Sequence, residues 1–286
     1  RSRVTIQDSS VARKINAQYL IPVGDPAFEK LSLDATIGSE RLADVDTRTV
    51  ELRPGLTQVF GRWQRVLFVR FARVTTTTPT TTPTTPPTVT RRDRLVIPGV
   101  SYAALAGRTI SQPFIGRGFY GELTGSHHAL GSDSNYLRLD LRDERVFDLS
   151  ARWHLIARGE LGVSFVANFP ELPASERFFA GGDRSVRGFA LNELSPVDAN
   201  GNKTGGRHLI VASLEIERDL PRRFAIAAFV DAGNALNKLS DPLEYSAGLG
   251  VRWKLPVLSV GIDVAQPLSR GGAGPRFHLN ITPNLK

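Results

Sequence analysis

The chain has 286 residues, with 36 Lys and Arg against 28 Asp and Glu, so its formal charge is +8. Its longest apolar run, at 224–230, has about seven residues, which excludes a transmembrane helix of roughly 20 residues. It has no Cys, which excludes a disulfide scaffold, thiolate catalysis and Cys-ligated zinc. The basic residues stand singly among acids, so we expect no nucleic acid as a partner.

Alternation of apolar and polar residues with a period of two dominates the chain. In 136–142 the leucines share one face, and charged residues of both signs lie on the other. In 209–217 an apolar face lies opposite Ser213, Glu215 and Glu217. The apolar faces are continuous, and several end in Trp or Tyr. Lipid outside, a polar lumen inside and aromatic residues at the interfaces give a transmembrane β-barrel this pattern. We therefore predict an all-β, antiparallel transmembrane barrel, with a soluble β-sandwich or a lipocalin-like barrel as the alternative.

Fourteen strands are predicted in chain order. They lie near residues 2–7, 12–22, 29–38, 48–58, 64–74, 94–105, 117–127, 135–147, 153–166, 208–218, 223–233, 244–254, 258–266 and 276–282. Short connections are predicted at 24–27, 60–62, 149–152, 219–222 and 256–257. Longer ones are predicted at 39–46, 75–93, 129–134, 168–207, 234–241 and 269–275. Short turns on one side and long loops on the other are typical of an outer-membrane barrel, with the long loops outside.

The connection at 75–93 begins with a run made almost entirely of Thr and Pro. This run has no apolar face to bury, and Pro cannot join the interior of a ladder. We predict an external low-complexity loop over 75–93.

The longest connection, 168–207, contains the segment RFFAGGDRSVRGF at 177–189. Gly181, Gly182 and Gly188 allow backbone conformations with positive φ, so this loop can fold compactly. If Arg187 is buried in the lumen, it needs carboxylate partners, because an unpaired buried charge is costly. The alternation places two acids, Glu215 and Asp231, on the lumen side of adjacent strands.

This segment resembles the signature of the outer-membrane assembly barrel superfamily, the bacterial surface antigen or BamA/TamA type. In that family the sixth external loop folds into the lumen and carries a V/I-R-G-F/Y tip. The form ERFFAGGDRSVRGF, preceded by FPELP at 169–173, is most similar to the TamA type, the barrel subunit of the translocation and assembly module. The segments 211–217, 229–236 and 248–268 resemble the family's later strands, and the resemblance is specific over 135–285.

The resemblance implies the roles of the loop residues. Arg187 would bridge to Glu215 and Asp231 and hold the loop 168–207 inside the barrel; the alternative is three unrelated charges in a wet lumen. The other motif residues would shape the tip of the loop. They are Gly181, Gly182, Asp183, Arg184, Gly188 and Phe189.

The family barrel has sixteen strands, and alignment with it places Arg1 at about the third. The chain 1–286 is therefore expected to be a single barrel domain that lacks its first strands and the periplasmic POTRA domains. The last strand resembles the family's terminal strand and would form the seam of the barrel. Its seam residues would be Phe277, Leu279, Ile281 and Leu285. Asn280 and Thr282 stand where related chains carry two glycines.

The implied function is the insertion or translocation of other β-barrel proteins, autotransporters in particular. A substrate strand would add to the weakly paired seam by β-augmentation. The implied place is the bacterial outer membrane, and the implied partners are its lipid and lipopolysaccharide, the substrate barrels and a TamB-like periplasmic protein bound through POTRA domains. We expect no enzyme activity, cofactor or metal, because no catalytic set can be placed. The alternatives are a secretion translocator, of the two-partner or patatin-type autotransporter kind, and a passive porin.

Overall fold

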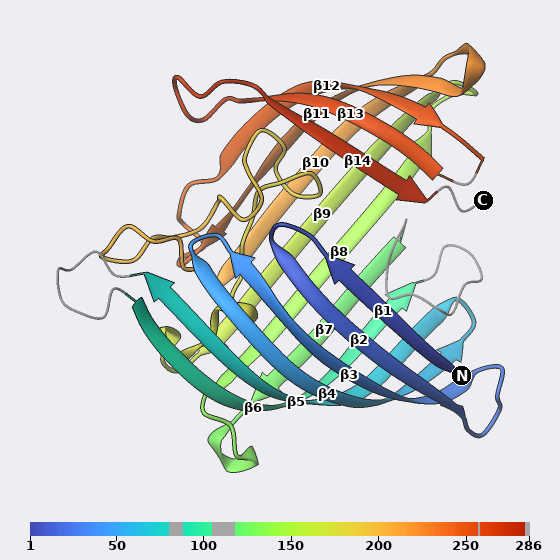
Figure 1. Ribbon diagram of the computed structural model, residues 1–286. Helices are drawn as coiled ribbons and strands as arrows, with labels where there is room; N and C mark the ends of the chain where they lie inside the picture. The colour runs from blue at the N-terminus through green and yellow to red at the C-terminus, as the bar shows by residue number, and fades with distance from the viewer. Residues whose placement is uncertain (80–87, 105–117, 257, 284–286) are drawn as a thin grey trace.

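A computed structural model describes residues 1–79, 88–104, 118–256 and 258–283. These residues form one sheet of fourteen strands, each paired antiparallel with its neighbours in the chain (Figure 1). The strands are β1 Ser2–Asp8, β2 Ala12–Pro22, β3 Glu29–Leu42, β4 Val45–Phe60, β5 Trp63–Pro79, β6 Thr88–Ala104, β7 Gly118–Ser126, β8 Tyr136–Asp148, β9 Trp153–Val166, β10 His208–Asp219, β11 Phe224–Leu236, β12 Glu244–Lys254, β13 Leu258–Pro267 and β14 Arg276–Pro283. The predicted all-β antiparallel architecture is confirmed. In the described part of the chain, none of the helical segments has the length and apolarity that a membrane crossing requires.

The two faces of the sheet differ as the alternation predicts. On the outer face, Leu214 and Leu249 have 51% and 68% of their surface exposed. On the inner face, Glu215, Asp231 and Arg252 are buried. Large apolar side chains exposed on strand after strand need an apolar solvent, and lipid supplies it.

Two hairpins are longer than the sequence predicts. Loops were expected at 39–46 and over 75–93, but β3 and β4 are joined by residues 43–44 alone, and β5 and β6 extend to Pro79 and from Thr88. The loop prediction was therefore wrong at both ends of 75–93, while 80–87 lie outside the described residues. Threonine is β-branched and suits a pleated strand, and Thr77 and Thr90 pair across the ladder with their hydroxyl oxygens 3.3 Å apart. A Pro at the end of a strand interrupts no ladder interior.

The sheet curves into a barrel wall with β1 and β14 at its two edges (Figure 1). Within the described residues, β1 pairs with β2 and β14 pairs with β13, and no ladder joins β1 to β14. The segment 168–207 lies partly on the inner side of this wall and partly at its rim, where Asn202 and Lys203 donate to Pro79 and Asp44 (Figure 1). Its 3-10 turns, Phe169–Glu171 and Ala174–Glu176, are followed by irregular chain that closes on itself through single bridges.

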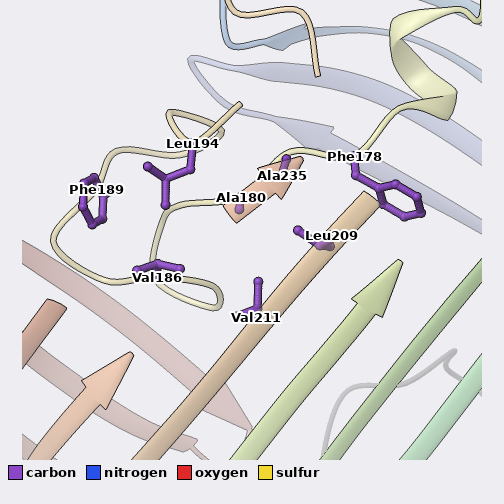
Figure 2. Packing of buried hydrophobic residues seen from close by; sticks show 8 residues of the cluster. All are labelled: Phe178, Ala180, Val186, Phe189, Leu194, Leu209, Val211 and Ala235. Carbon is purple, nitrogen blue, oxygen red and sulfur yellow. The ribbon is translucent and has the colours of Figure 1, made fainter. Parts of the chain in front are cut away.

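The apolar packing of the molecule lies in the lumen, between this segment and the wall (Figure 2). One cluster joins five loop residues to β10 and β11; its members are Phe178, Ala180, Val186, Phe189, Leu194, Leu209, Val211 and Ala235. A second cluster packs the start of the loop against β5, β6 and β8. Burial of apolar side chains thus holds the loop against both sides of the wall.

Candidate functional site

The site is the tip of the segment 168–207, which we call the luminal loop, together with the strands that receive it. Antiparallel bridges pair Phe178 with Gly206 and Ala180 with Leu194, so the loop returns along its own path. Gly188 has a φ of +94°, which L side chains rarely adopt. A Cβ there would lie 3.1 Å from the Cβ of Ser246 on β12, so glycine permits both the turn and the close approach to the wall.

Arg187 lies at the centre of the tip and is 2% exposed. Its Nε and Nη2 donate to the two carboxylate oxygens of Asp231 at 2.8 and 2.9 Å, and its backbone N–H donates to the same carboxylate at 3.0 Å. Its Nη1 donates to Glu215 at 2.6 Å. The guanidinium also lies over the ring of Phe229, 3.3 Å from its centroid. A bidentate pair with charge-assisted bonds fixes both the position and the orientation of the guanidinium.

Two further arginines and a third acid complete the network. Asp263 on β13 accepts from Nη1 of Arg187 at 3.4 Å. Arg252 on β12 donates to Glu215 at 3.0 Å and to Asp263 at 3.2 Å. Arg158 on β9 donates to Glu215 at 3.3 Å. Three guanidinium groups therefore meet three carboxylates, and a balanced, hydrogen-bonded set avoids the large penalty of an unpaired buried charge.

The remaining motif residues take different positions. Phe189 is buried in the apolar cluster of Figure 2. Gly181 and Gly182 both have positive φ and are buried, and the N–H of Gly181 donates to the hydroxyl of Ser185. Asp183 binds His278 of β14, whereas Arg184 is exposed beside them. The structure therefore brings together the predicted Arg187, Gly188, Phe189, Glu215 and Asp231, and leaves Arg184 outside the network.

A second attachment holds the start of the luminal loop to the opposite side of the wall. The carboxylate of Glu176 accepts from Nη2 of Arg70 at 2.8 Å and from the hydroxyl of Tyr136 at 3.0 Å. Burial opposes ionisation of this carboxyl, but nearby Arg70 and Arg138 outweigh burial and hold its pKa below the ordinary value. Glu176 is thus a buried carboxylate that stays charged because its partners are cations.

Residues 110–282, more than half of the chain, match the Omp85 superfamily domain. The chain belongs to the Omp85 superfamily. It is 27% identical over 155 residues to the outer membrane protein assembly factor BamA of Nitratidesulfovibrio vulgaris, a match that covers 51% of this chain and 19% of that protein. As a barrel of this superfamily it is an integral protein of the bacterial outer membrane.

Solved structures agree on the fold. BamA of Haemophilus ducreyi lacking POTRA domains 1–3 superposes with a TM-score of 0.78 at 16% identity, over 96% of this chain and 62% of that one. CdiB of Acinetobacter baumannii gives a TM-score of 0.59 at 14% identity, over 95% and 50% of the two chains. The chain thus spans less than two thirds of the length of these two structures.

The predicted seam residues of this Omp85 barrel lie on β14 with their side chains outward. Phe277, Leu279 and Ile281 have 77%, 62% and 65% of their surface exposed. Leu285 lies outside the described residues. Asn280 faces inward and donates to Asp263 at 3.0 Å.

Asp263, Glu176 and His278 were not identified as site residues from the sequence. Asp263 lies on the polar face of its alternating strand, so a search for every inward acid near Arg187 could have found it. His278 likewise lies on the polar face of its alternating strand, but its loop partner lies 95 residues away in the chain. Glu176, in the irregular loop, carried no such signal, and its partner Arg70 lies 106 residues away. In the described ranges, no group of three or more His, Asp or Glu side chains could hold a metal ion.

Proposed function

We propose that this barrel inserts or translocates other β-barrel proteins, autotransporters among them, through a lateral seam at β14. Membership of the Omp85 superfamily and the likeness to BamA structures support a role in outer-membrane protein insertion or secretion. The TamA-like form of that role is our proposal from the motif ERFFAGGDRSVRGF. In this role the chain provides a surface for strand pairing rather than a catalytic site.

The observation that carries the proposal is the occupied lumen. The luminal loop packs against β5, β6 and β8 at one end and against β10 and β11 at its tip, and both attachments include buried ion pairs. A passive porin keeps an aqueous channel through its centre. A loop held in this way favours a route for the substrate protein along the barrel wall over a route through an open pore.

The edge strand supplies the chemistry that such a path requires. Backbone N–H and C=O groups that face lipid without a partner cost several kcal/mol each, so the outer edge of β14 favours any strand that can pair with it. A substrate strand could add there by β-augmentation, with backbone hydrogen bonds giving affinity that depends little on sequence. The outward row Phe277, Leu279 and Ile281 would keep the paired strands at the depth of the lipid.

A secretion translocator is the second candidate, and the likeness to CdiB barrels favours it. In that case an unfolded chain would pass through the lumen, and the luminal loop would have to leave its site. We also propose lipid and lipopolysaccharide as the surroundings of the outer face, and a TamB-like periplasmic partner bound through POTRA domains upstream of this barrel.

The two candidates differ in what must open. Because the chain has no native Cys, a disulfide between residue 279 and the native first strand, in the protein with its natural upstream sequence, would lock the seam alone. In proteoliposomes, oxidation should block the insertion of a β-barrel substrate, and reduction should restore it. Full activity of the locked protein would refute lateral opening and leave luminal transport as the better account.

A further inference from the structure

The terminal strand β14 turns three polar side chains toward the lumen. Arg276, His278 and Asn280 alternate with the outward residues of the predicted seam. His278 is 8% exposed, whereas its two outward neighbours are more than half exposed. All three inward side chains reach the luminal loop or the ion network that holds it.

His278 makes two contacts with the tip of the luminal loop. Its Nε2 accepts from the backbone N–H of Gly188 at 3.0 Å. Its Nδ1 lies within hydrogen-bond distance of the carboxylate of Asp183. An imidazole nitrogen that accepts carries no hydrogen, so Nδ1 holds the proton and donates to Asp183. One ring thus joins β14 to both ends of the turn that carries Arg187.

Asn280 and Arg276 extend this connection in both directions along the strand. Asn280 donates to Asp263, the acid that also binds Arg187 and Arg252. Arg276 lies 3.2 Å from the carboxylate of Glu193 on the returning limb of the luminal loop. The Arg276 pair is half-exposed and contributes little by itself, whereas His278 and the Asp263 partner of Asn280 are buried.

The luminal loop and β14 are not packed tightly against each other beside these contacts. A cavity of about 670 Å³ lies beside them, lined by loop residues 181–185 and 190–192 and by β14 residues 276–278. Because β14 has one ladder partner in the described residues, its position rests on β13 and on these polar contacts. Hydrogen bonds depend on distance and direction, so a shift of the luminal loop breaks the contacts that His278 and Arg276 make with it. Asn280 is linked to the loop indirectly, through Asp263 of β13.

We propose that Arg276, His278 and Asn280 are positioning residues through which the luminal loop controls the terminal strand. With Arg187 in its network, the loop holds β14 against β13. When the loop leaves, β14 loses both contacts of His278 and the Arg276 pair, Asp263 loses its bond from Arg187, and the β14 ladder opens more easily. The consequence for substrate insertion rests on the proposed function, but the coupling of loop and strand does not.

Hydrogen exchange in a lipid bilayer tests the coupling without any substrate. In the double variant His278→Leu, Asn280→Ala, three hydrogen bonds are lost, and the β14 amides that pair with β13 should exchange at least about tenfold faster. Leu279→Ala, on the outward face of the same strand, is the matched control and should leave their exchange nearly unchanged. His278→Gln keeps a donor and an acceptor and should restore most of the protection. Equal exchange in the double variant and in Leu279→Ala would overturn the proposal.

A second variant acts from the other side of the connection. Among the described residues, Arg187 makes its side-chain hydrogen bonds with β10, β11 and β13 and none with β14. Arg187→Ala should nevertheless raise exchange in β14 if the loop positions the strand. Faster exchange in the loop with unchanged exchange in β14 would refute the coupling. Neither measurement needs a substrate. A barrel that failed to insert proteins could therefore still show the coupling between loop and strand, and a barrel that inserted proteins could lack it. Heat-modifiable migration on gels reports whether each variant is folded.

Discussion

Strands β1–β3 and strands β10–β13 follow the same rule, apolar outside and polar inside, yet their inner faces are organised differently. On β2 and β3 the inward polar groups pair with the nearest side chain across the ladder, as Lys14 with Glu40 and Gln18 with Asp34. On β10–β13 the inward acids are buried, and they bind arginines from other strands and from the luminal loop.

The luminal loop causes this difference. Where it covers the wall it removes water, and each buried charge then needs a partner in fixed geometry. Where water can reach the wall, local pairs that contribute little are sufficient. Identical strand patterns therefore yield a tightly held region and a loosely held one.

The largest expected effect is the loss of the central cation. Arg187→Ala leaves three carboxylates short of one partner and should cost roughly 3–5 kcal/mol of loop attachment, less where water enters the lumen. The barrel itself should remain folded while the loop becomes sensitive to added protease. Lys14→Ala is the matched cation on the inner face of the loosely held region; it removes the partly exposed pair with Glu40 and should change stability by about 0–1 kcal/mol. Similar losses for the two variants would contradict the comparison.

The lipid face should not distinguish the two regions. Leu214→Arg on β10 should destabilise the barrel by about 2–4 kcal/mol if the residue lies near the bilayer midplane. Ile15→Arg on β2, also outward and exposed, should have an effect of the same order. Reversible denaturation in lipid vesicles gives both values. A negligible effect at either position would mean that this part of the outer face does not contact lipid.

Substitution of two glycines with positive φ distinguishes the cost of backbone strain from the cost of crowding a neighbouring side chain. Gly188→Ala should cost about 1–3 kcal/mol, because it strains the backbone and crowds Ser246. Gly61→Ala, in the turn between β4 and β5, meets nothing within 4 Å and should cost about 1 kcal/mol from strain alone. Thermal unfolding of the two variants should rank them in this order, and the reverse ranking would show that the tip of the loop adapts to a side chain.

The smallest expected effect depends on pH and concerns Glu176. Its pKa is lowered in the folded protein, so its contribution to loop attachment is complete above the ordinary pKa of 4.5 and is lost as the pH falls through the folded-state value. Glu176→Gln keeps an acceptor for Arg70 and should lower stability at pH 7 by about 1 kcal/mol. The difference between the variant and the parent should shrink in strong acid. A difference that stays constant down to pH 3 would exclude ionisation of Glu176 as its source.

The sequence by itself determined the strands. A period of two in side-chain direction is a local property, so alternation in 209–217 or 244–254 places each strand and its lipid face without knowledge of its partners. The pairing of Arg187 with Glu215 and Asp231 was also open to prediction, because the family resemblance pairs the arginine of the motif with the two acids that the alternation places inward.

The tertiary structure decided which inward groups meet. Asp263, Glu176 and His278 join the luminal loop only because the wall curves and brings strands far apart in the chain around one lumen. The extent of the Thr-rich hairpin was likewise set by its ladder partner rather than by composition. Contacts across a lumen depend on how strongly the wall curves, and the alternation of residues along a strand does not encode the distance between facing strands.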